Sequence, residues 1–193
     1  MPASMSAGER IRQEGLFAGT LGANPLGDIL FVDSVNGVNG NDGQSRRFPK
    51  ATLVNALANM VAGDTVVLAA GGSETVTATV AVSLARVNII CPVTNPESGY
   101  TITGAGSLNL MTVSAADVSI KGLRFQRTAG AGATAAGILT TAAADRLRVE
   151  KCSFDYTDLT SAWTNYGISL VDDLEDVEIV DCKFRDCHRG VFW

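Results

Sequence analysis

Long apolar runs, aromatic residues and histidine are all scarce in this sequence. Aromatic residues make up 6% of the 193 residues, and no apolar run reaches the roughly 18 residues of a transmembrane helix. The first residues carry charges where a signal peptide would need its apolar run, so we expect no membrane insertion and no targeting segment. The net charge of −5 argues against binding to nucleic acid, whose backbone favours a basic surface.

Metal-binding and cofactor motifs are also missing. The four cysteines include no CxxC pair, and the single histidine, His188, is close in sequence only to Cys182 and Cys187. The glycine-rich stretch DSVNGVNGNDGQS at 33–45 lacks the GK[ST] of a phosphate loop, and aligning its glycines with a calcium loop puts a valine at the first ligand position. We therefore predict no metal and no cofactor, and interpret 33–45 as a polar crossing from a strand to a helix.

What the sequence does contain divides it into three parts. Residues 1–28 are charged and then rich in glycine and alanine, which predicts an extended N-terminal arm. Residues 29–63 hold an entry strand, the polar loop and an amphipathic helix, expected at 52–61 with Thr52 as its N-cap. Residues 64–193 contain only short apolar segments between Gly, Ala, Thr and Asp, a pattern typical of strands without intervening helices.

A repeat of about 30 residues organises this last part of the chain. The segments VSIKGLRF, LRVEKCSF and VEIVDCKF are spaced by 29 and then 30 residues, and acidic residues precede each of them. A second strand recurs in step, since Gly137-Ile138 lies 30 residues before Gly167-Ile168. The aligned apolar positions are Val118, Leu147 and Val177; Ile120, Val149 and Ile179; Leu123, Cys152 and Cys182; and Phe125, Phe154 and Phe184.

Such repeats predict a stack. One unit cannot close a core alone, but stacked units can, with equivalent side chains about 4.8 Å apart. Cys152 and Cys182 are then interpreted as small buried apolar residues, although a disulfide between them is geometrically conceivable. The prediction is an all-β solenoid of about five coils over 64–193, with the helix at 52–61 covering its N-terminal end.

The loop at 33–45, the helix ending in AGDTVVL and the VEIVDCKF-type repeats together resemble right-handed parallel β-helix proteins of the pectate-lyase-like superfold. More narrowly, residues 29–193 are similar to the short β-helix proteins encoded by tailed bacteriophages and prophages. The resemblance implies a right-handed parallel β-helix capped by the helix. It says little about activity, because one fold hosts many functions.

The densest acidic cluster consists of Asp172, Asp173, Glu175 and Asp176. Clustered carboxylates could act as a catalytic pair or a calcium site on this scaffold, whereas the alternative interpretation is a solvated turn between coils. The pectate-lyase signature vWiDH is absent, and so are the polygalacturonase motifs as a set. We therefore lean against an enzyme and predict no catalytic residues.

Aromatic residues around the loop DYTDLTSAWTNYG form a second candidate site. Tyr156, Trp163 and Tyr166 lie beside carboxylates and amides, a combination that could bind a sugar ring. The alternative, which we favour, is a loop that folds over the core.

These observations favour a non-enzymatic structural protein of a bacteriophage particle, made in the host cytoplasm. We expect a capsid decoration or head-fibre protein that attaches through its N-terminal region to other virion proteins, above all the major capsid protein. The sequence stops at RGVFW on apolar residues, so we expect a longer chain or another subunit, in a homotrimer, to cover that end. The alternatives are a tailspike or tail fibre that binds or degrades host surface polysaccharide, and a non-catalytic glycan-binding adhesin.

Overall fold

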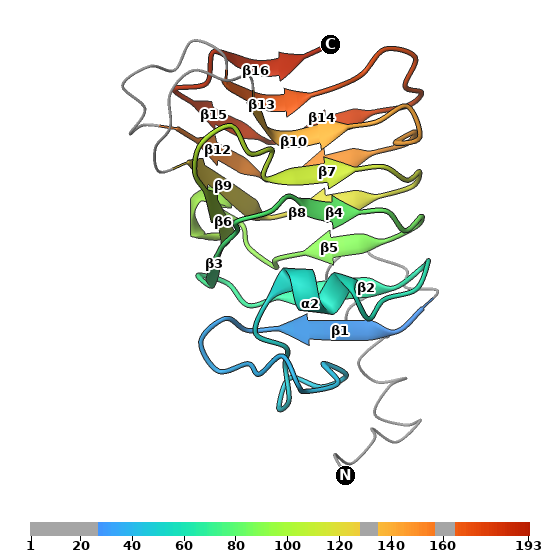
Figure 1. Ribbon diagram of the computed structural model, residues 1–193, viewed down its shortest axis with the longest axis vertical. Coiled ribbons are helices and arrows are strands. Elements are labelled where there is room, and N and C mark those ends of the chain that lie inside the picture. The colour runs from blue at the N-terminus through green and yellow to red at the C-terminus, as the bar shows by residue number, and fades with distance from the viewer. Residues whose placement is uncertain (1–26, 128–134, 157–164) are drawn as a thin grey trace.

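The computed structural model describes residues 27–127, 135–156 and 165–193. In these residues the chain forms short strands that assemble into three parallel sheets, here named A, B and C (Figure 1). The all-β class predicted from the sequence is therefore confirmed. Within the described ranges, no helix is long and apolar enough to cross a membrane.

Within each sheet the strands lie side by side in chain order. Sheet A contains β1 (Ile29–Val32), β2 (Thr65–Leu68), β5 (Asn88–Ile90), β8 (Ser119–Lys121), β11 (Arg148–Glu150) and β14 (Glu178–Val180). Sheet B contains β3 (Ser73–Thr75), β6 (Tyr100–Gly104), β9 (Leu123–Arg127), β12 (Ser153–Asp155) and β15 (Lys183–Arg185). Sheet C contains β4 (Val80–Val82), β7 (Met111–Val113), β10 (Ala135–Thr140), β13 (Asn165–Ser169) and β16 (Arg189–Phe192).

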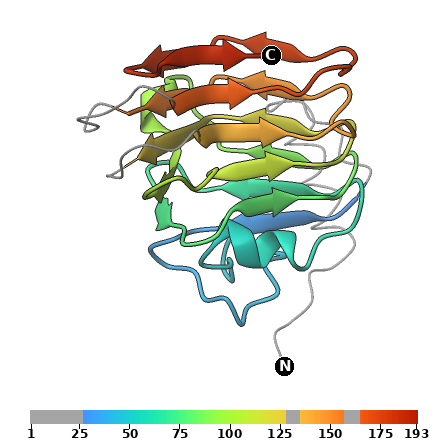
Figure 2. The same ribbon diagram turned by 45° about the horizontal axis from the view of Figure 1, so that its top comes forward.

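The chain visits the sheets in a fixed order, A then B then C, and each such round adds one strand to the same edge of every sheet. The strands β2, β3 and β4 form the first round, and β14, β15 and β16 form the last. Figures 1 and 2 show the rounds stacked from the blue N-terminal strand to the red C-terminal strands. This arrangement is compatible with a parallel β-helix.

The register between rounds is the one that the repeats predict. Val149 pairs with Ile120 on one side and with Ile179 on the other, and Phe154 pairs in the same way with Phe125 and Phe184. The three phenylalanine rings are stacked with centroids 5.0 Å apart and planes within 7° of parallel. Equivalent apolar residues thus build one continuous core along the stack.

Glycines in sheet C make room for this phenylalanine stack. A Cβ atom on Gly137 would lie 2.7 Å from Cδ1 of Phe154, and one on Gly167 would lie 2.5 Å from the ring of Phe184. Gly190 repeats the position one round later, 3.0 Å from the same ring. The recurring glycine is therefore required by close approach of an aromatic ring rather than by an unusual backbone angle.

The corner that leads into sheet A is built from residues in the left-handed conformation. Arg86, Asp117, Arg146 and Asp176 have φ angles between 53° and 61°. The amide groups of Arg86, Asp117 and Arg146 each donate to a carbonyl of the same corner in the next round, at 2.8–3.1 Å. The polar residues that precede each repeat in the sequence thus mark stacked corners. Aspartate tolerates this backbone conformation well, and at the arginine positions the hydrogen bonds between rounds hold it in place.

The predicted helix is present but shorter than expected. It spans α2 (Leu53–Leu57), where Thr52 accepts a hydrogen bond from the amide of Asn55 as the predicted N-cap. The extension to residue 61 is wrong, because the amide of Met60 bonds to the carbonyl of Leu57, a tighter turn than an α-helix allows. Met60 is still buried, so its place in the apolar pattern reflects packing and not continued helix.

The polar loop at 33–45 closes around the side chain of Lys50. Lys50 is 3% exposed, and its ammonium group donates to the backbone oxygens of Asn41 at 2.8 Å and Asn39 at 3.4 Å. Gly43, with φ of +76°, lets the loop turn against the lysine stem. The carbonyl oxygens of this glycine-rich loop therefore bind a cation that the chain itself supplies.

The described cysteines are free thiols. Cys91 and Cys152 are buried and Cys182 and Cys187 are partly buried. The burial of Cys152 agrees with its interpretation as a small apolar residue, whereas Cys182 is only partly covered. The predicted N-terminal arm falls almost wholly outside the described residues, which begin at 27.

Candidate functional site

The acidic cluster predicted from the sequence lies in one turn, between β13 and β14. Asp172, Asp173, Glu175 and Asp176 are all exposed. Asp173 and Asp176 have positive φ angles, and the amide of Glu175 is bonded to the side chain of Asp145 in the preceding round at 3.0 Å. The four residues thus share one exposed, tight corner. No group of three or more His, Cys, Asp or Glu side chains in the described ranges is arranged to hold a metal ion.

An open hollow of about 630 Å³ adjoins this turn at the C-terminal end of the stack. Asp172 and Asp173 stand on its rim, and Leu174 and Val177 contribute apolar surface. Trp193, which is 79% exposed, completes the lining. The hollow combines carboxylates with an exposed aromatic ring, a pairing of groups that suits a hydroxyl-rich ligand.

The residues of the predicted aromatic site lie in different surroundings. Tyr156 is fully buried, and its hydroxyl donates to the carbonyl of Tyr166 at 3.0 Å, so its ring belongs to the core. Tyr166 is half-buried and stacks on Phe192 with ring centroids 4.6 Å apart. Trp163 lies outside the described residues. The proposed role of these residues in binding glycan stays a prediction.

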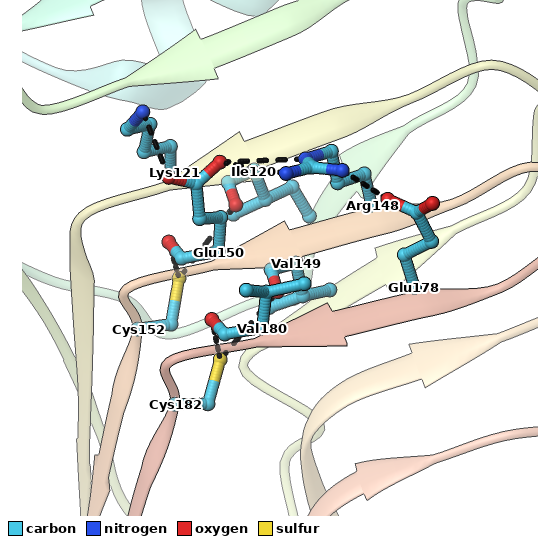
Figure 3. A network of polar contacts seen from close by, with 9 residues as sticks. All are labelled: Ile120, Lys121, Arg148, Val149, Glu150, Cys152, Glu178, Val180 and Cys182. Atoms are coloured by element: carbon cyan, nitrogen blue, oxygen red, sulfur yellow. Dashed lines mark hydrogen bonds and ion pairs between the residues drawn. The ribbon is translucent and has the colours of Figure 1, made fainter.

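The outer face of sheet A carries a ladder of ion pairs across the later rounds (Figure 3). Glu150 accepts from Lys121 at 2.9 Å and from Arg148 at 3.3 Å, and Arg148 also contacts Glu178 in the last round. The pKa of the Glu150 carboxyl is lowered, since these cationic neighbours outweigh the opposing effect of burial. The ladder links three successive strands through their side chains as well as through their backbones.

Sheet B has a second charged surface, which the repeat pattern does not reveal. Asp155, 5% exposed, accepts from Arg124 at 2.6 Å and lies 3.7 Å from Arg185. Arg185 also binds Glu97 at 2.7 Å, although the two residues are 88 positions apart. Glu97 belongs to the 3₁₀ turn η1 (Pro96–Ser98), an insertion that reaches strands of later rounds. A pairing over this distance leaves no signal in the sequence of either partner.

Glu74 is a buried carboxylate that the sequence analysis did not single out. One oxygen, Oε2, accepts from the amide of Leu53 at 2.8 Å and from the hydroxyl of Tyr100 at 3.1 Å. The other, Oε1, has no hydrogen-bond partner among the described residues. Glu74, Thr52 and Asn55 line one hollow of about 280 Å³, so Glu74 lies where the start of α2 meets the first round. Burial raises the pKa of this carboxyl, against the opposing effect of its two donors.

Glu74→Gln should change how stability depends on pH. A raised pKa means that the folded state holds the proton more tightly than the unfolded state, so this residue's contribution to stability is complete below the unfolded pKa near 4.5. That contribution is lost as pH rises through the higher folded pKa. Glutamine keeps an oxygen acceptor for Leu53 and Tyr100 but has no charge. The free energy of unfolding of the variant should therefore rise relative to that of the parent protein as pH rises from 4 to 8.

Urea unfolding at a series of pH values measures this difference. Glu175→Gln makes the same chemical change on an exposed side chain and corrects for the loss of one charge. A difference in free energy of unfolding between Glu74→Gln and the parent protein that stays constant over the whole pH range would contradict the prediction.

Comparison of the chain with protein-family models, with curated proteins and with solved structures found no match.

Proposed function

We propose that the chain is a right-handed parallel β-helix of five coils and that it serves as a structural component of a bacteriophage particle. In this proposal each round through the three sheets is one coil, and α2 covers the N-terminal end of the core. The most specific role is a capsid decoration or head-fibre protein that attaches through its N-terminal region to the major capsid protein and assembles as a homotrimer in the virion.

The observation that supports this proposal most is the register of the stack. Equivalent side chains lie directly above one another through successive rounds, as the Phe125, Phe154 and Phe184 stack illustrates. Continuous backbone pairing and an unbroken core make such a stack a rigid body, which suits a part that must hold its shape on a particle surface. The sequence resemblance to short β-helix proteins of tailed phages supplies the link to the virion.

Particles produced by the phage or prophage that encodes the chain provide the test. Mass spectrometry and antibody-labelled electron microscopy of purified particles should detect the protein on the head. A variant that lacks residues 1–26 keeps the hydrogen bonds of Asp28 to Asp64 and Thr65, so it should retain the circular dichroism and unfolding transition of the parent but should not be incorporated. Absence of the full chain from purified particles, or full incorporation of the truncated one, would overturn the proposal.

A tailspike or tail-fibre role is the second candidate, and the hollow beside Asp172, Asp173 and Trp193 is the observation that favours it. In that case the protein would be found on the tail and would bind or cleave a host surface polysaccharide. Trp193→Ala should then weaken binding on a glycan array by about tenfold or more, since stacking on an aromatic ring and excluding water are lost together. Equal binding by both proteins would count against this candidate.

A further inference from the structure

Two thiols of successive rounds lie opposite one another at the bend between sheets A and B. The flanking residues fix their register, because Glu150 pairs with Val180 and Ser153 pairs with Lys183. Cys152 therefore faces its equivalent, Cys182, across one strand spacing of about 4.8 Å. This separation falls within the Cα–Cα range of roughly 4.4–6.8 Å that a disulfide requires.

Hydrogen bonds place both sulfur atoms on the same side of the bend. Sγ of Cys152 donates to the carbonyl of Ile120 at 3.8 Å, and Sγ of Cys182 donates to the carbonyl of Val149 at 3.5 Å. Figure 3 shows the two side chains one above the other, with parallel orientations. A bond between them would require side-chain rotation but no shift in the register of the strands.

The two thiols differ in exposure and in acidity. Cys152 is fully buried, which raises its pKa, whereas Cys182 is partly exposed in the last round. The neighbouring Cys152 side chain lowers the pKa of Cys182, so Cys182 is the thiol that ionises first. Cys187, also partly exposed, has a pKa raised to about 12 by burial. Cys182 is therefore the residue at which an accessible thiolate forms first.

We propose that Cys182 and Cys152 form an oxidation site for small-molecule disulfides of the glutathione type, and that their reaction ties the last two rounds together. The thiolate of Cys182 attacks one sulfur of the reagent, and the other sulfur leaves as a thiolate that takes up a proton. The thiol of Cys152 then loses its proton to solvent and attacks Sγ of Cys182, which releases the second reagent thiol. Two protein thiols are oxidised to one disulfide, and one reagent disulfide is reduced to two thiols.

The bond would join a buried strand to an exposed one. The side chains of β12 are all buried, whereas those of the neighbouring strand β15 are all exposed. A disulfide that closes the chain between positions 152 and 182 restricts separation of the last round from the one before it.

The test is to incubate the reduced full-length protein with glutathione disulfide under native conditions, block the remaining thiols and map the peptides by mass spectrometry. We expect a cross-linked Cys152–Cys182 peptide, with Cys91 and Cys187 alkylated. Amide hydrogen exchange of β14, β15 and β16 should slow by about tenfold or more, as expected for a disulfide of ordinary strength.

Serine variants separate the steps of the reaction. Cys152→Ser should stop at a stable mixed disulfide on Cys182, because the second thiol is missing, while Cys187→Ser should form the cross-link as the parent does. Glutathione on Cys187 or Cys91 instead of Cys182 would overturn the proposal. So would a cross-link that forms only in urea, or unchanged exchange in the last round after cross-linking.

Discussion

Replacing Arg127 with methionine is expected to lower the free energy of unfolding by about 2–4 kcal/mol. The side chain is 1% exposed, and its guanidinium donates to the carbonyls of Gly106, Leu108 and Ala136. It also lies 5.5 Å from the centre of the Tyr156 ring. Methionine matches much of the volume but offers no donor, so three carbonyls from two separate segments would lose their shared partner.

Urea unfolding measures this cost, and Arg185→Met provides the control. The Arg185 side chain is 55% exposed and forms surface ion pairs, which contribute less than about 1 kcal/mol. The stability of Arg127→Lys should lie between those of the two methionine variants, since a single ammonium group cannot reproduce the planar array of donors. Equal stability of the Arg127→Met and Arg185→Met variants would show that the buried guanidinium is not holding these segments together.

Phe154→Ala should be comparably destabilising, by about 3–5 kcal/mol. Phe154 is fully buried, and its ring stacks on both Phe125 and Phe184. Truncation would remove both ring contacts and leave a cavity beside Gly137, which has no side chain to fill it. Denaturant unfolding, with an unchanged dependence on denaturant concentration, is the appropriate measurement.

Phe184→Ala is the matched control for this prediction. It removes the same side chain from the same stack, but Phe184 is 36% exposed, and among the described residues its ring stacks on Phe154 alone. The loss should be less than about 2 kcal/mol, because less apolar area returns to water. A larger effect at Phe184 than at Phe154 would mean that the end of the stack, and not its middle, limits stability.

The features that could be predicted from the sequence are those that repeat. Because the rounds stack in register, Ile120, Val149 and Ile179 had to occupy one column, and the spacing of 29 and 30 residues was enough to align them. The strand β3 has no such apolar column, because its sequence is Ser-Glu-Thr. The inward residue of β3 is Glu74, and its contacts with Leu53 and Tyr100 explain its burial.

The candidate sites were harder to predict for a similar reason. The acidic cluster stood out because its carboxylates are adjacent in the sequence, and the structure gives them an exposed turn. Glu74 and Arg127 carry no comparable signal, since their partners are the backbone of distant segments and, for Glu74, also the hydroxyl of Tyr100. The pairing of Cys152 with Cys182 was visible from the repeat, but the order in which they ionise depends on burial and hydrogen bonding in the folded protein.

Lys50 gives the entry loop a property that its sequence alone does not suggest. A loop that closes on a dissolved ion folds to an extent set by the concentration of that ion. Here the positive charge is covalently part of the loop, and it reaches the oxygens of Asn39 and Asn41 whenever the chain folds. Assembly of the loop around this charge is therefore a unimolecular event, equally available inside a cell and in dilute surroundings outside it.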